Sequence, residues 1–218
     1  MPSHYDSIKG DITAIRNGLD NTIRNIRSNP NYSDTGRRRE MAKATVAARR
    51  EADQLKAQFT TQRAAERTRL ERQLFGVNSN DPSAVILMRD SQDRAAKLDS
   101  SDDATAMLDR AQQTGDTYLA RAVAQRASTQ GWTDIVNTYA DTTGTRDLFD
   151  ALADNPDGRN TRVADAMVFQ IPAPTELRGM ADHDLQHIAD TYTEQEQHDS
   201  KHRAHMNSGG LGTTFYPS

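Results

Sequence analysis

The chain has 218 residues, of which 35% are hydrophobic and 27% are charged, and it contains no cysteine. The length allows one or two domains, and the lack of thiols excludes a disulfide framework, a cysteine-based metal site and a cysteine nucleophile. The longest apolar run, Ala84–Met88, has five residues, far fewer than the roughly 18 of a membrane span. Residues 1–6 also lack the pattern of a signal peptide. We therefore expect neither a secreted nor a membrane-spanning protein, and no membrane partner.

The net charge of -4 conceals two regions of opposite sign. Residues 1–76 carry 15 basic and 9 acidic side chains, a balance of +6, whereas residues 77–218 carry 12 basic and 22 acidic ones, a balance of -10. Such asymmetry indicates two functional regions or head-to-tail packing between copies. Codon usage in a GC-rich genome would explain the excess of arginine over lysine, but not the change of sign near residue 76.

The first predicted element is a helical arm over residues 1–76. Apolar residues recur at steps of three and four over Tyr5–Ile26, so Ile12 and Leu19 belong to one stripe on a helical face. Isoleucine is a middling helix former, and burial of this stripe against a partner must therefore stabilise the helix. The proline within Asn29–Asn31 ends it, because proline has no N–H to donate.

A second, proline-free helix is predicted over Thr35–Leu74. Its first half can fold back on the first helix as an antiparallel hairpin, although pairing between chains is left open. The stretch Thr60–Arg69 has almost no apolar residue except alanine and would need another chain or project into solvent. The basic residues Arg37, Arg38 and Arg39 are candidate partner-binding residues, most simply for an acidic surface of another copy. Direct nucleic-acid binding is a weaker alternative, because acids are interspersed and a stacking platform is missing.

A compact helical domain is predicted over residues 77–155, after a turn-forming cluster where the charge also changes sign. Loops of two to four residues would make its short helices antiparallel neighbours. We expect Trp132 and Tyr139, seven residues apart, to lie in the core rather than to stack on a ligand. The expected helices begin near Asp81 or Ser83, at Ser101, after Gly115, near Trp132 and before Leu148.

A linker and a C-terminal helix are predicted over residues 156–206, followed by an extended tail over residues 207–218. Within the linker, Val163–Ile171 is ambiguous between helix and strand. A further helix is expected over Thr175–Tyr192, since its apolar residues recur at steps near three and four. The tail combines glycines with terminal aromatics, which suits an anchor on a neighbouring subunit. Its candidate partner-binding residues are Leu211, Phe215 and Tyr216.

Candidate chemistry is sparse. His183 and His187 lie four residues apart, so they share a helical face and could hold a metal with a third ligand from residues 194–205. The intervening Asp184 is too short to replace the glutamate base of a zinc protease, and a solvated polar face is the simpler interpretation. Phosphate-binding loops and nucleophile elbows are missing from the sequence. We expect no catalytic residue, no metal and no cofactor.

Four segments carry a resemblance to a known family. Residues 3–16 read Ser-His-Tyr-x-x-Ile-Lys-Gly-Asp-Ile-Thr-Ala-Ile-Arg, and residues 36–42 read Gly-Arg-Arg-Arg-Glu-Met-Ala. Residues 114–124 read Thr-Gly-Asp-Thr-Tyr-Leu-Ala-Arg-Ala-Val-Ala, and residues 131–139 read Gly-Trp-Thr-Asp-Ile-Val-Asn-x-Tyr. Over roughly residues 3–153 the chain resembles small helical proteins encoded among the virion structural genes of actinobacterial phages and prophages. The resemblance implies a head or neck component without enzymatic activity, and it carries over no catalytic residue.

The sequence thus predicts an all-α protein with a long N-terminal hairpin or arm, a compact multi-helix domain and an extended C-terminal tail. The expected role is a non-enzymatic structural component of a phage virion, in the head or the head–tail connection. Its partners would be copies of itself and other virion proteins of the shell, portal or neck. Its location would be the virion, with the host cytoplasm during assembly. The alternative is a cytoplasmic regulatory or nucleic-acid-binding coiled-coil protein.

Overall fold

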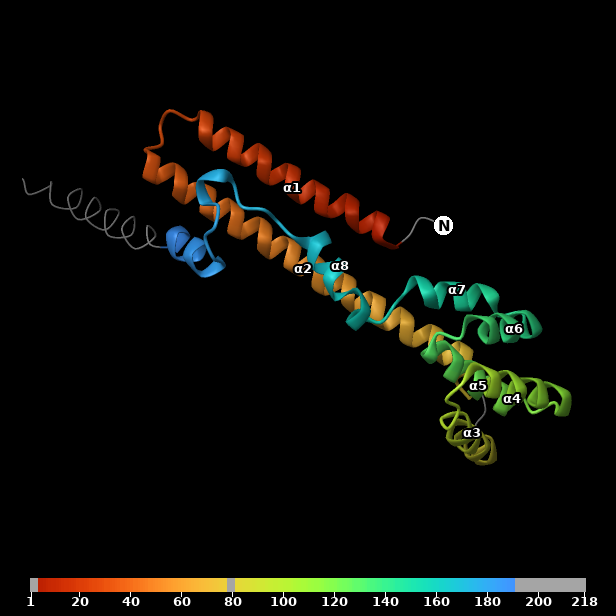
Figure 1. Cartoon of the computed structure of the whole chain (residues 1–218). Helices are drawn as coiled ribbons and strands as arrows, with labels where there is room; N and C mark the ends of the chain where they lie inside the picture. Colours follow the sequence, from red (N-terminus) through yellow and green to blue (C-terminus); the bar gives the residue numbers. More distant parts are fainter. Residues whose placement is uncertain (1–3, 78–80, 191–218) are drawn as a thin grey trace, which may run out of the picture. The chain divides into compact units, whose positions relative to one another are not determined.

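The computed structural model describes residues 4–77 and 81–190, and this part of the chain is all-α, without a strand. The chain forms two compact units. Unit 1 comprises residues 1–58 and 163–218, and unit 2 comprises residues 59–162. Figure 1 colours them along the sequence, and each unit is described separately below. The predicted all-α fold class is confirmed.

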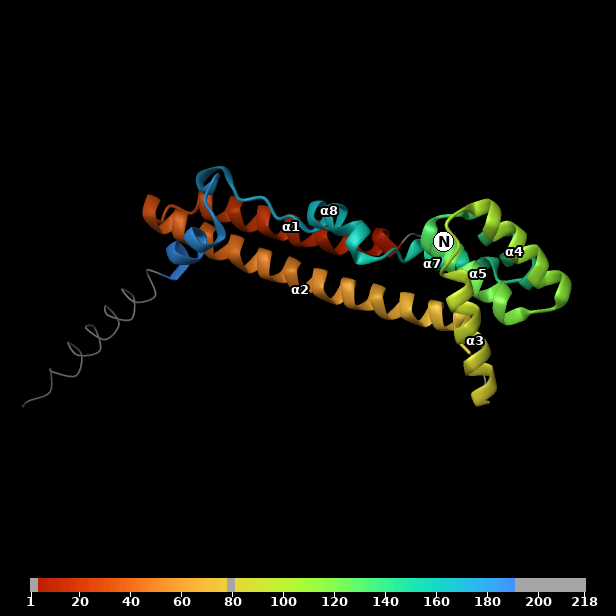
Figure 2. The ribbon, with the colours of Figure 1, turned by 60° about the horizontal axis from the view of Figure 1, so that its bottom comes forward.

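Unit 1 is built on a hairpin of α1 (His4–Ser28) and the first part of α2 (Asp34–Phe75). The two helices run side by side in both views (Figures 1 and 2). Most of the apolar stripe of α1 is buried, and small or unbranched side chains of α2 are buried with it. The arm therefore closes within one chain. The buried residues are Ile8, Ile12, Leu19, Ile23 and Ile26 of α1 and Met41, Ala42, Ala48 and Ala52 of α2.

The C-terminal part of unit 1 returns to this hairpin (Figures 1 and 2). It contains the end of α8 (Gly158–Phe169), a 3-10 turn η1 (Thr175–Leu177) and helical residues 182–190. Residues 168–177, which we name the strap, include side chains that are fully or nearly buried. These are Phe169, Ile171 and Leu177.

Two expectations for this region were resolved by the structure. The ambiguous Val163–Ile171 is helical as far as Phe169. The continuous helix expected over Thr175–Tyr192 is wrong within the described residues, because the chain turns at Gly179, which has a φ of +80°. The next helix starts afresh, with the Ala181 N–H donating to the Asp184 carboxylate at 3.2 Å. This bond is the reverse half of a capping box, in which a side chain of the first helical turn accepts from the N–H of the residue that precedes the helix.

Unit 2 contains the second part of α2 and five short helices. Their starts are capped by side chains in three cases: Asp81 accepts from Ser83 N–H, Ser100 from Asp103 N–H and Asp116 from Leu119 N–H. Their ends at Gly115, Gly131 and Gly144 are left-handed, which glycine adopts without strain. The helices are α3 (Pro82–Ala95), α4 (Ser101–Thr114), α5 (Thr117–Gln130), α6 (Thr133–Thr143) and α7 (Arg146–Asp154).

The core of unit 2 is one continuous cluster that begins on α2, with Leu70, Leu74 and Phe75, and runs through α7. The Phe149 ring is in edge contact with Phe75 at 5.8 Å and with Tyr139 at 6.2 Å between ring centroids. Trp132 packs against the same cluster. The expected core position is confirmed for Tyr139, whereas Trp132 is partly buried at the edge of the core.

The contacts divide the chain inside α2, between Gln58 and Phe59, and again between Arg162 and Val163. The domain bounds at 76, 155 and 206 stay predictions. The second part of α2 packs with the helices that follow it. Phe59 is 1% exposed, and the guanidinium of Arg63, itself 3% exposed, lies 5.0 Å from the centre of its ring. The stretch Thr60–Arg69, expected to need another chain or to project into solvent, thus buries at least this side chain within its own chain.

Candidate partner-binding surfaces

The α1 stripe that the sequence offered for partner binding lies inside the hairpin. Ile12 is 1% exposed and Leu19 is 7% exposed. Burial of such side chains contributes roughly 1.5–3 kcal/mol each and stabilises the pairing of α1 with α2. Contact of these two residues with another chain stays a prediction.

The three consecutive arginines at the start of α2 differ in their surroundings. Arg37 is half-buried and pairs with Asp34 at 3.0 Å, whereas Arg38 is exposed. Arg39 is buried, with its Nε 3.5 Å from a carboxylate oxygen of Glu40. Consecutive helical residues are about 100° apart around the axis, so the three cannot form one patch. Arg38 is the member best placed to contact a partner.

Other arginines of the hairpin attach the strap. Arg16 donates to the carbonyl oxygen of Val168 at 2.8 Å and to that of Gln170 at 2.8 and 3.2 Å. Arg27 donates two hydrogen bonds to the carboxylate of Glu176, at 2.8 and 2.9 Å. These bonds, with the charge of Arg27, lower the pKa of Glu176 to about 2. Part of the positive charge of the arm therefore serves attachment within the chain.

Two further arginines on α2 extend this attachment. Arg49 donates to the carbonyl oxygen of Ile171 at 3.3 Å and pairs with Asp182. Arg50 donates to the side-chain oxygen of Gln186 at 2.7 Å. Spacing along one helix could not reveal acceptors that lie more than 120 residues away.

The hairpin also carries a groove of about 810 Å³, lined by α1 and α2 alone. Its side chains are mostly small or apolar, and its charged members are two acids, Asp11 and Glu51. We name it the hairpin groove. The small side chains that line it are Ala14, Gly18 and Thr22 of α1 and Ala44, Ala47 and Ala48 of α2.

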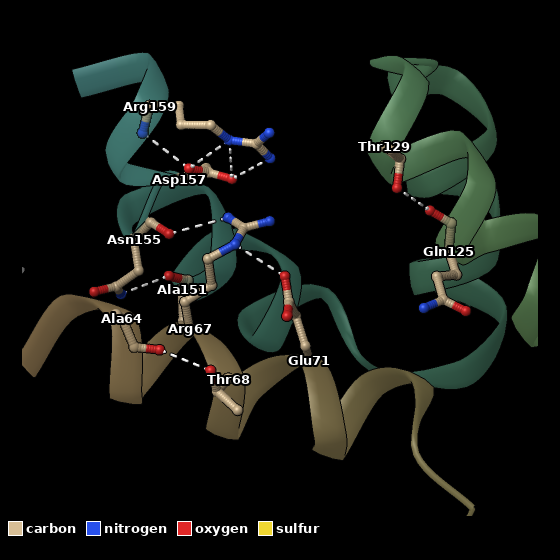
Figure 3. A network of polar contacts seen from close by, with 10 residues as sticks. All are labelled: Ala64, Arg67, Thr68, Glu71, Gln125, Thr129, Ala151, Asn155, Asp157 and Arg159. Atoms are coloured by element: carbon tan, nitrogen blue, oxygen red, sulfur yellow. Dashed lines mark hydrogen bonds and ion pairs between the residues drawn. The ribbon is translucent and has the colours of Figure 1, made fainter. Parts of the chain in front are cut away.

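Unit 2 has a cleft of about 650 Å³ with an apolar floor that includes Phe75 and Phe149. Figure 3 shows the polar groups beside it. Arg67 donates to the carbonyl oxygen of Asn155 at 3.1 Å and pairs with Glu71 at 2.9 Å. Arg67 and Glu71 thus neutralise each other, and the hydrogen bond from Arg67 to Asn155 joins α2 to the end of α7.

The second ion pair at this cleft joins Arg159 to Asp157 at 2.9 Å (Figure 3). The hydrogen bonds from Arg159 lower the pKa of Asp157 to about 2. A general acid or base at neutral pH needs a pKa near 7. The shift at Asp157 runs the opposite way, so this carboxylate is suited to an ion pair and not to proton transfer.

Large apolar side chains are exposed on two helices of the described chain. Val85, Ile86 and Leu87 of α3 are 43–66% exposed. Val163 and Met167 of α8 are 72% and 70% exposed. Scattered exposed residues are ordinary, but neighbouring ones on one helix indicate a contact surface.

The remaining candidates from the sequence are the histidine pair and the tail residues. His183 is exposed and lies 2.9 Å from Asp184. Within residues 4–77 and 81–190, no group of three or more histidine, aspartate or glutamate side chains could hold a metal. The other candidate ligands, at residues 194–205, and the tail residues Leu211, Phe215 and Tyr216 lie outside the described residues.

Comparisons with protein-family models, with curated proteins and with solved structures found no match. None of the helices in the described part of the chain is long and apolar enough to cross a membrane.

Proposed function

We propose that the chain is a non-enzymatic structural component of a phage virion, in the head or the head–tail connection, that binds neighbouring subunits. The observation that carries the proposal is the hairpin groove. It is a surface on a two-helix arm whose lining includes the short side chains named above, and such positions suit the close approach of another helix. The resemblance of residues 3–153 to virion-associated helical proteins supports the setting.

The polar groups of the molecule favour an assembly role over catalysis. The strongly perturbed carboxyls, Glu176 and Asp157, have their pKa lowered by arginine partners. Catalytic carboxyls at neutral pH need the opposite shift, which burial or a like charge produces. These two carboxyls act in attachment between segments of the chain.

The alternative of nucleic-acid binding through residues 1–76 gains less support. Arg16, Arg27 and Arg49 donate to acceptors of the strap or of residues near it, and Arg39 is buried. Phosphate binding requires exposed bases that can release counterions. A salt-sensitive shift of DNA by the full chain would favour the alternative, with affinity falling steeply as salt rises.

The proposal is tested by quantitative mass spectrometry of purified mature particles. We expect the chain at a fixed ratio to the major shell protein, retained after a salt wash that strips adsorbed proteins. A second arm uses a chain that ends at residue 206, because the tail is the predicted anchor. We expect lower occupancy in particles with an unchanged circular dichroism spectrum. Absence of the chain from both the mature particles and their assembly intermediates would contradict the proposal.

A further inference from the structure

The two sides of the hairpin are covered differently. Arg16 points to the strap, to which it donates three hydrogen bonds. Gly18 lies two residues further on, about 200° around the helix axis, and lines the groove. The lining residues of the groove all come from α1 and α2. The strap therefore covers one side of the hairpin, and among the described residues none outside α1 and α2 lines the groove on the other side.

The shape of the groove suits a helix. On α1, Ala14, Gly18 and Thr22 repeat at one-turn intervals and present short side chains. A β-carbon placed on Gly18 would meet nothing within 4 Å, so there is space above this position. Side chains spaced by one turn on an opposing helix can enter such a row, which is the usual ridges-into-grooves packing.

The outer face of α8 carries a ridge of that spacing. Val163 and Met167 are four residues apart, one turn, and are 72% and 70% exposed. The opposite face of the same helix is buried at Asp165 and Phe169. Met is unbranched and adapts to irregular gaps, which suits a contact surface. We name Val163 and Met167 the α8 ridge.

Charge also matches between the ridge and the groove. Arg162, directly before the ridge, is exposed. The charged lining of the groove is acidic, at Asp11 and Glu51, and both side chains are exposed. Opposite charges around an apolar contact favour encounter and fix the register of the partners.

We propose that the occupant of the hairpin groove is a second copy of this chain, which inserts its α8 ridge there. The ridge and the groove are different surfaces of one unit, so each copy can both offer and receive the contact. Contacts of this type join copies in series and close into rings when the rotation allows. The proposal names the partner for the assembly role above and rests on that role for its biological setting.

Cysteine-free chains allow a direct test by disulfide trapping. Full-length Gly18→Cys and Met167→Cys chains are mixed, treated with diamide and separated without reductant. We expect a mixed disulfide-linked pair, because a bridge forms only when the two Cα atoms come within about 7 Å. Asn17→Cys, about 100° around α1 from Gly18, is the control partner and should give at least tenfold less of the mixed product. Equal trapping in both mixtures, or none in either, overturns the proposal.

A second pair of variants tests the groove without cross-linking. Gly18→Leu fills the groove, and its new β-carbon meets no atom within 4 Å. Asn17→Leu places the same side chain at an exposed position about 100° around α1, outside the row that lines the groove. We expect sedimentation to show at least tenfold weaker self-association for Gly18→Leu and no change for Asn17→Leu. Equal self-association in the two variants overturns the proposal.

The same cysteine chains separate this inference from the proposed function. If the chain is present in particles but the Gly18→Cys and Met167→Cys chains are not cross-linked in them, the virion role is retained and the contact is rejected. If the two chains are cross-linked in solution but are absent from particles, the contact is retained and the virion role is rejected. A last measurement is the reaction of the Gly18→Cys thiol with maleimide in dilute monomer. Slow reaction that becomes fast when residues 191–218 are removed would assign the groove to that segment and overturn the proposal.

Discussion

Units 1 and 2 are of similar size but are stabilised by different means. Unit 2 has one continuous apolar cluster from Leu70 to Leu152, with Phe149 in contact with two other rings. Unit 1 has a single apolar stripe between two helices and a strap attached by arginines that donate to carbonyl and carboxylate oxygens. The low hydrophobic content of the chain thus does not indicate disorder. In unit 1, polar attachment supplements a narrow core.

The largest effect is expected from Phe149→Ala in unit 2. The change removes both ring contacts and leaves a cavity in the continuous core, which typically costs about 3–5 kcal/mol. Urea unfolding followed by circular dichroism measures the loss. Ile86→Ala, at a side chain that is 66% exposed, is the control and should change stability by less than about 0.5 kcal/mol. A loss below about 1 kcal/mol for Phe149→Ala would contradict a single cooperative core.

In unit 1 we expect Leu177→Ala to act mainly on the strap. Leu177 is 0% exposed, and truncation of a buried leucine costs about 2–5 kcal/mol. Amide hydrogen exchange should quicken over residues 168–177 while α4 and α5 of unit 2 keep their protection. Leu87→Ala, the same change at a side chain that is 53% exposed, serves as the matched control. Uniform loss of protection in both units would show that they do not open separately.

A smaller effect is expected at the start of α5. Asp116 accepts a hydrogen bond from the Leu119 N–H at 2.9 Å, so Asp116→Ala should cost about 1 kcal/mol in the free energy of unfolding. Asp116→Ser keeps an acceptor and should recover most of that loss. Thermal unfolding of the two variants side by side measures the difference in stability. Equal stability of the two variants would show that the side-chain cap at Asp116 does not stabilise unit 2.

The smallest effect is expected from acid at Glu176. Its pKa is about 2 in the folded chain against 4.5 for an ordinary glutamate, so its ion pair stabilises unit 1 fully above about pH 5. This contribution is lost as the pH falls from there to about pH 2. The loss is small, because the pair is exposed and screened. Glu176→Gln should flatten the dependence of stability on pH in this window, and an unchanged slope would contradict the ion pair.

Much of the helical architecture could be predicted from the sequence. Steps of three and four located α1 and α2, and the pairs Gly115–Asp116 and Gly131–Trp132 marked helix ends that the structure shows within a residue or two. These signals are local, because they depend on neighbours within one helical turn. The continuous pattern near Thr175 was misleading, because periodicity alone did not reveal the left-handed turn at Gly179.

The candidate surfaces were less predictable, because they depend on which distant segment each helix face meets. The pattern of α2 runs on through Gln58 and Phe59, so it does not show that the two belong to different units. Arg16 and Gln170 are separated by 154 residues. Composition identified a basic arm, but only the fold shows that Arg16 is engaged, Arg39 is buried and Arg38 is exposed.

The return of the strap to α1 has a consequence for the order of folding. Unit 1 is discontinuous in sequence, and unit 2 lies wholly between its two parts. During synthesis, residues 59–162 are therefore available to fold before the strap exists, while the hairpin still lacks the cover of one side. Contacts at large sequence separation form slowly, and exposed apolar surface favours premature association in the meantime. Nascent chains that stop before residue 163 should accordingly associate non-specifically, and synthesis of the strap should bury this surface.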